Sequence, residues 1–199
     1  GFRSVNLFSE NLNYLASSRY FVIIDNPTYE EAWNYGLNLT RYIPINDREL
    51  RVTAEFYRTD FLKQTVVDID SDVREVRFYD LNGKSYSNNY QLEFAYQPVD
   101  RLDVTAAVRY TDVKANYGDQ FLIKPLSSKY KGLVTLSYAT EESGWLFDSS
   151  FLLNGGGRIP STQQNPVEFR RAESFPAFLT INAQITKKID FIDIYLSAE

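Results

Sequence analysis

The chain has 199 residues, of which 44% are apolar and 24% charged, and its formal net charge is −5. This composition is typical of a globular protein. The absence of Cys and His excludes disulfides, thiolate metal sites, a cysteine nucleophile and a Ser-His-Asp triad. The negative charge and the scattered basic residues argue against a nucleic-acid partner. No apolar run approaches the about 18 residues of a transmembrane helix, whereas membrane-spanning strands, whose signal is alternation, stay possible.

The first 26 residues follow no single period. Residues 6–18 mix apolar and polar side chains, and we expect an irregular lead-in there. Residues 20–24 (YFVII) form a short apolar run that could be a strand.

From residue 32 onward, apolar and polar residues alternate, which predicts strands with one apolar and one polar face. The pattern is clearest over residues 101–112. There Leu102, Val104, Ala106, Val108 and Tyr110 share one face, and Asp103, Thr105, Ala107, Arg109 and Thr111 share the other. A membrane-spanning strand needs about 9–11 residues, and this one is long enough. We predict seven further strands at about residues 33–40, 50–57, 86–96, 132–139, 145–151, 177–186 and 192–197.

The predicted connections alternate between short and long. Short turns fall near residues 46, 99, 142 and 188, and long connections near residues 72, 121 and 165. Outer-membrane barrels have short periplasmic turns and long extracellular loops. Aromatic residues of the apolar faces gather at both ends, as the two membrane interfaces favour. Tyr96, Tyr138 and Trp145 lie toward the short turns, and Trp33, Tyr35, Tyr90, Tyr110 and Tyr130 toward the long connections.

We therefore predict an all-β fold, an antiparallel meander of about eight long strands in the wall of a large transmembrane β-barrel. The polar faces carry mostly Thr, Ser, Asn, Gln, Asp and Glu, which suits a watered or plugged lumen better than the packed interior of an eight-stranded barrel. One alternative is a complete small eight-stranded outer-membrane barrel (an anchor, adhesin or enzyme), whose first and last strands would pair. Another is a soluble β-sandwich or lipocalin-like binding protein, whose apolar faces would pack a dry core.

Several segments resemble the barrel of TonB-dependent outer-membrane receptors, especially those of Bacteroidetes type. They are residues 31–36 (EAWNYG), 56–61 (FYRTDF) and 78–89 (FYDLNGKSYSNN), with residues 1–3, 17–19 and 195–199 as further pieces. The resemblance implies that residues 1–199 are a segment from the C-terminal half of a barrel of about 22 strands. It also implies the import of a siderophore, cobalamin, glycan or peptide-like ligand across a Gram-negative outer membrane, with energy from the TonB system, and neither enzyme activity nor a cofactor.

Several features of that family are not found in the sequence. We find no plug domain, no TonB box, no final strand ending in an aromatic residue, no signal peptide and no Met, and we expect an internal piece of a longer chain. An open sheet of eight strands would leave two edges unpaired, which is untenable in lipid.

Two loops carry candidate site residues. Asp68, Asp70 and Asp72 alternate, as calcium ligands can, but Val73 stands where an EF-hand loop needs Gly, so a solvated acidic loop is the favoured interpretation and no metal is expected.

The second candidate loop begins at residues 155–158 (GGGR). This run lacks the ending of a phosphate loop and indicates a flexible extracellular loop. Arg158, Arg170 and Arg171 share the loop and are the candidates for gripping an anionic ligand. Glu141 and Glu142 are adjacent on a turn and cannot form a catalytic pair. Asp103 and Arg109 could form a charge ladder on the polar face.

Overall fold

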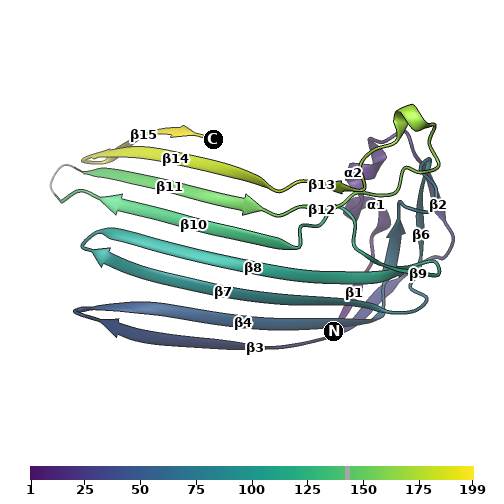
Figure 1. The fold of residues 1–199 in the computed structure, drawn as a ribbon, viewed down its shortest axis with the longest axis horizontal. Helices are drawn as coiled ribbons and strands as arrows, with labels where there is room; N and C mark the ends of the chain where they lie inside the picture. Colours follow the sequence, from purple (N-terminus) through teal and green to yellow (C-terminus); the bar gives the residue numbers. More distant parts are fainter. Residues whose placement is uncertain (142–143) are drawn as a thin grey trace.

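The computed structural model describes residues 1–141 and 144–199, which form an all-β fold with two regions (Figure 1). One region is an antiparallel sheet of long strands. The other consists of short elements gathered at one end of that sheet, and we call it the cap (residues 5–28, 64–84, 115–129 and 155–177). The predicted turn at residues 141–143 lies partly outside the described residues.

The long sheet is the predicted meander. Its eight long strands follow one another in chain order across the sheet, each antiparallel to the next, which confirms the predicted all-β antiparallel arrangement. Short strands β1 (Phe2–Ser4) and β9 (Gln120–Ile123) add to β3 and β8. The long strands are β3 (Tyr29–Ile45), β4 (Arg48–Lys63), β7 (Ser85–Val99), β8 (Leu102–Tyr117), β10 (Tyr130–Ala139), β11 (Trp145–Asn154), β14 (Phe178–Ile189) and β15 (Ile192–Ala198).

The alternation of short and long connections is confirmed as well. The short turns at residues 46–47, 100–101 and 190–191 lie together at one end of the sheet, and the long connections lie together at the other, where they form the cap (Figure 1). Asn46 and Asp190 have φ values of 53° and 49° in their turns, a left-handed conformation that Asn and Asp tolerate better than most residues. Arg101 adopts it too, with a φ of 64°. Each turn therefore reverses the chain within a few residues and fixes the register of its hairpin.

The cap has secondary structure of its own. The 20–24 run forms a strand as expected, β2 (Tyr20–Ile23), which pairs in parallel with β6 (Glu75–Asp80), and β6 pairs antiparallel with β5 (Thr65–Asp68). These strands run across the end of the long sheet (Figure 1). The long connection near residue 72 was thus expected to be a loop, but it contains the two strands β5 and β6. The other cap elements are α1 (Leu7–Glu10), α2 (Leu12–Leu15), β12 (Gly157–Arg158), the 3₁₀ turn η1 (Val167–Phe169) and β13 (Ser174–Phe175).

The buried apolar side chains described belong to the cap. Phe78 and Val76 are fully buried, and Phe21 stacks on Phe78 with ring centroids 5.4 Å apart. A second cluster gathers around Val66 and Tyr117. This core makes the cap a packed unit, whereas a set of solvated loops had been expected.

The glycine run also differs from its prediction as a flexible loop. A Cβ added at Gly155, Gly156 or Gly157 would lie within 2.7 Å of a backbone carbonyl oxygen of a neighbouring segment. The three glycines therefore permit close backbone approach, one of the uses of residues without a Cβ.

The long sheet is open among the described residues. β15 pairs with β14 alone, and β1 pairs with β3 alone. The pairing of first and last strands that a complete eight-stranded barrel requires is not found in residues 1–141 and 144–199, and the apolar face is not covered by a second sheet as in a sandwich. Neither of the two α-helices described, each four residues long, could cross a membrane.

Candidate functional site

One face of the long sheet is mostly apolar. Residues paired across antiparallel strands lie on the same face, so the register identifies each face directly. Tyr90, Tyr110 and Tyr130 form one row across β7, β8 and β10. The rows nearer the short turns are mostly apolar and remain exposed, as at Leu39 (60%) and Val108 (50%). Arg41, Ser149 and Lys187 are the polar side chains in these rows. One such row consists of Val52, Phe94, Ala106, Val134, Phe151 and Ile181, and it ends on β3 with Arg41.

The eight aromatic residues that the alternation assigned to the apolar faces lie on this face, whereas Tyr42 and Tyr57 lie on the opposite one. Beyond the tyrosine row, toward the cap, the same face becomes polar. There the Tyr35 hydroxyl donates to Asp60 (3.1 Å), and Arg58 holds Asp60 through nitrogen–oxygen distances from 2.6 Å. Tyr86 likewise donates to Asp112 (2.8 Å). The face is therefore divided into an apolar band, an aromatic row and a charged margin.

The opposite face is polar over the same strands. Arg51 pairs with Glu93 at 3.0 Å, and Ser137 donates to Asp148 at 2.6 Å. The predicted charge ladder is not formed: Asp103 accepts from Gln97 (3.3 Å), and Arg109 lies between Gln91 and Lys131 in the register.

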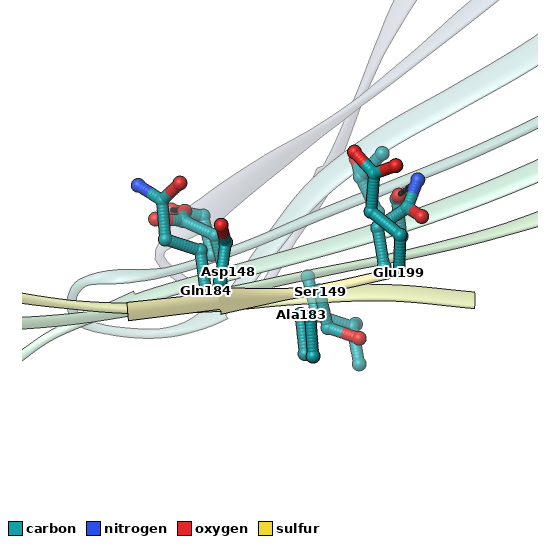
Figure 2. A pocket seen from close by; sticks show the side chains of 12 residues that line it. Asp148, Ser149, Ala183, Gln184 and Glu199 are labelled. Carbon is teal, nitrogen blue, oxygen red and sulfur yellow. Dashed lines mark hydrogen bonds between the residues drawn. The ribbon is translucent and has the colours of Figure 1, made fainter. Parts of the chain in front are cut away.

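A shallow cavity of about 370 Å³ is lined by residues from both faces of the sheet. It lies over β10, β11, β14 and β15. Figure 2 shows Asp148, Gln184 and Glu199 pointing to one side of the sheet, and Ser149 and Ala183 pointing to the other. The charged and amide groups labelled here thus belong to one face, and Ser149 is a polar side chain on the other.

The three candidate aspartates have separate partners within the cap. The Asp68 side chain, 2% exposed, accepts from the amides of Asp70 (2.8 Å) and Ser71 (3.0 Å), from the Ser71 hydroxyl and from the Tyr79 hydroxyl (3.0 Å). Burial acts to raise the pKa of Asp68, but these hydrogen bonds outweigh it and leave the pKa below its ordinary value. Asp72 pairs with Arg74. Among the described residues, no group of acidic side chains is arranged to hold a metal ion.

Asp70 forms an ion pair with Arg158. The Arg158 guanidinium donates to both carboxylate oxygens, at 2.7 and 2.9 Å, and its Nε donates to the carbonyl of Ile123 at 2.8 Å. The two side chains are 21% and 9% exposed. Bidentate pairs of this kind are geometrically specific. Arg158, in the β11–β14 connection, therefore contacts the β4–β7 connection through Asp70 and the β8–β10 connection through Ile123. Its guanidinium is used for these contacts within the protein.

Arg170 and Arg171 lie elsewhere, at the wall of a larger cavity. This cavity, about 690 Å³, is also lined by Arg19 and Arg74. Arg170 donates from Nε to the carbonyl of Asn165 (3.0 Å), and the Arg171 amide donates to Thr162. The sequence had grouped Arg158 with these two because all three share one loop. Arg19 and Arg74 were missed, since they come from other segments and no local pattern marks them.

The comparisons with known proteins identify no relative. No protein-family model matches the chain, and no curated protein matches it at a significant level. The resemblance to TonB-dependent receptors thus stays a prediction, and function is argued below from the two faces of the sheet and from the cap.

Proposed function

We propose that the chain forms part of the wall and the outer loops of a large transmembrane β-barrel in a Gram-negative outer membrane. The apolar face contacts lipid, the polar face lines a water-filled or plugged lumen, and the cap lies outside the cell. The observation that carries the proposal is the exposed, mostly apolar band bounded by aromatic residues, with the described short turns at one end.

The dimensions of the band support a membrane span. On β8 the band extends from Leu102 to Tyr110. At about 3.3 Å per residue, this distance is roughly 26 Å along the strand, and about 20 Å along the membrane normal at a tilt of about 40°. Outer-membrane barrels carry an apolar band about 25 Å tall, and the span on β8 is close to this height.

The open sheet supports a barrel of more strands. β15 is exposed along its whole length, and a backbone edge of this kind cannot face lipid because no water is present to satisfy its N–H and C=O groups. The proposal therefore requires further strands beside β15 and beside β3, supplied from outside residues 1–199. The polar face, with its Arg51–Glu93 pair, also suits the wide lumen that such a barrel encloses.

Within this proposal the barrel belongs to a TonB-dependent receptor that imports a siderophore, cobalamin, glycan or peptide-like ligand. This part rests on the sequence resemblance and on the packed cap, which presents cavities at the long-connection end. The chain supplies wall and loops, with no catalytic role and no cofactor. Energy would come from the TonB system through a plug domain.

The experiment uses two alanines that are neighbours in the chain and lie on opposite faces. Ala106 pairs with Phe94 on the apolar face, and Ala107 pairs with Glu93 on the polar face. Because residues 1–199 contain no Cys, Ala106→Cys and Ala107→Cys each give a single labelling site within this part of the chain. A fluorophore at each position is measured in vesicles of ordinary lipid and of lipid carrying a nitroxide on the acyl chain.

Strong quenching at position 106 and weak quenching at position 107 is the expected result, since only the first faces the acyl chains. Equal quenching at the two positions contradicts the assignment of the faces. A protein that stays monomeric in aqueous buffer without detergent contradicts the membrane proposal as a whole.

A further inference from the structure

We infer that the cap contains a binding site for an anionic ligand with several oxyanion groups and an apolar body, in the cavity lined by Arg19, Arg74, Arg170 and Arg171. This inference rests on the proposed function in one respect, because it names the ligand class of the receptor. The cavity has a volume of about 690 Å³, within the range of about 300–1,000 Å³ that is typical of small-molecule sites.

The charge of the cavity is opposite to that of the chain. The protein has a net charge of −5, yet four arginines and a single acidic residue, Glu168, line this cavity. Concentrated positive charge in a hollow attracts anions and raises their local concentration. The bias is local and arises from segments that lie far apart in the sequence.

The arginines are largely available to a ligand. Arg74 donates from Nε and Nη2 to Asp72, at 3.4 and 3.3 Å, and its side chain is 77% exposed. Arg170 uses only its Nε, for the Asn165 carbonyl. In the described part of the chain, no carboxylate forms a salt bridge with Arg19, Arg170 or Arg171. Several guanidinium donors thus remain for carboxylate, phosphate or sulfonate groups, which arginine binds through paired hydrogen bonds.

Apolar side chains complete the wall between the arginines. Tyr14 and Phe169 contribute rings, and Ile69, Val73 and Leu126 contribute aliphatic surface. Ligand sites commonly combine a mostly apolar lining with a few converging polar groups. The mixture indicates a ligand larger than a bare inorganic anion.

The walls of the cavity are held in place by contacts that do not involve its arginines. Arg158 bridges to Asp70, next to Ile69, and the Gln164 side chain donates to the carbonyl of Ser71 (2.8 Å). These contacts join the β5–β6 turn to the β11–β14 connection. The site is therefore organised before a ligand arrives, which reduces the entropy cost of binding.

The test measures binding of benzene-1,3,5-tricarboxylate to the whole protein in an uncharged maltoside detergent at low salt, by calorimetry. Its uncharged triamide, of similar shape, is the ligand control. The variants are Arg19→Ala, Arg171→Ala and the two combined. Arg101→Ala, at an exposed arginine in the β7–β8 turn, is the protein control.

We expect saturable binding of the tricarboxylate at one site, and binding of the triamide at least about tenfold weaker. The double variant should weaken binding by about tenfold or more, and Arg101→Ala by less than about twofold, since arginine–carboxylate pairs contribute on this scale. Arg171→Lys keeps the charge and loses the paired geometry, so an intermediate loss is expected. Hydrogen exchange of residues 64–80 in each variant verifies that the cap is folded.

Absence of saturable binding, or unchanged binding in a folded double variant, overturns the site. The lipid-quenching experiment at positions 106 and 107 does not depend on these arginines. A lost binding site with intact face-selective quenching overturns this inference alone, and retained binding with equal quenching overturns the barrel alone.

Discussion

The cap and the long sheet, made by the same chain, are stabilised in different ways. Phe78 is fully buried in the cap, whereas Leu37 and Ile181 in the sheet are 58% and 49% exposed. The cap has its own apolar core, so burial on folding can hold it together as in a water-soluble protein. The sheet has the continuous backbone pairing of its hairpins and two open faces. The cap therefore buries its own apolar side chains, whereas the apolar side chains of the sheet depend on the surroundings for their burial.

The largest effect is expected from Phe78→Ala. Removing a fully buried ring costs about 3–5 kcal/mol, because a cavity remains and apolar area is lost. Amide hydrogen exchange should show the cap strands opening while the long strands keep their protection. Phe147→Ala, at a ring 41% exposed on the sheet, is the control and should leave cap exchange unchanged. Simultaneous loss of protection in both regions would show that they are one cooperative unit.

A charge on the apolar face should have the next largest effect. Ala106→Arg places a guanidinium toward the acyl chains, and arginine near the middle of a bilayer costs about 2–4 kcal/mol in a barrel. Ala107→Arg, on the polar face beside Glu93, should change stability little. Urea unfolding in lipid vesicles measures both. Equal losses from the two substitutions would contradict the proposed lipid-facing side.

Arg158→Ala tests the connection between cap loops. It leaves the carboxylate of Asp70, 9% exposed, without its guanidinium partner, and we expect the cap to lose about 2–3 kcal/mol, as for hydrogen bonds to charged groups. Arg171→Ala removes an arginine of the same loop that has no such partner, and its effect should stay within about 0.5 kcal/mol. Hydrogen exchange of residues 64–80 compares the two. A larger loss of cap stability in the Arg171 variant than in the Arg158 variant would contradict the structural role assigned to Arg158.

The smallest expected effect is a pH dependence of the β5–β6 turn in the cap. The folded pKa of Asp68 lies below its ordinary value of 3.8, so the stability it contributes is present above about pH 4 and is lost as pH falls through the folded pKa. The exchange rates of the Asp70 and Ser71 amides, corrected for intrinsic pH effects, should rise on acidification. Asp68→Asn should flatten that response. Protection of the long strands should not follow the same curve.

The sequence predicted the sheet far better than the cap. Apolar and polar residues alternate with a period of two along the long strands. Each residue from Leu102 to Tyr110 could therefore be assigned to a face without knowledge of the neighbouring strands. Tight turns such as that at Asn46 then fixed the hairpins. The resulting meander and the short–long alternation are as predicted.

The cap could not be predicted because its contacts join distant segments. Short strands such as β5 and β6 carry too few residues for periodicity to stand out. Asp68 and Asp70 appeared as a solvated acidic run because their partners, Tyr79 and Arg158, are not adjacent in the sequence. For the same reason, only Arg170 and Arg171 of the four arginines that line the cavity were candidates in the sequence, and their role there stays a prediction.

The ion pair between Asp70 and Arg158 bears on the order in which the chain folds. The two residues are separated by 88 positions, and Ser161 and Gln164 reach back over 91 and 93 positions to the same turn. The hairpins of the sheet close over only a few residues. Contacts of high sequence separation form slowly, because the chain entropy of the intervening loop must be lost first. We therefore expect the cap to assemble last, after the hairpins β3–β4, β7–β8 and β10–β11 have brought its distant pieces to the same end.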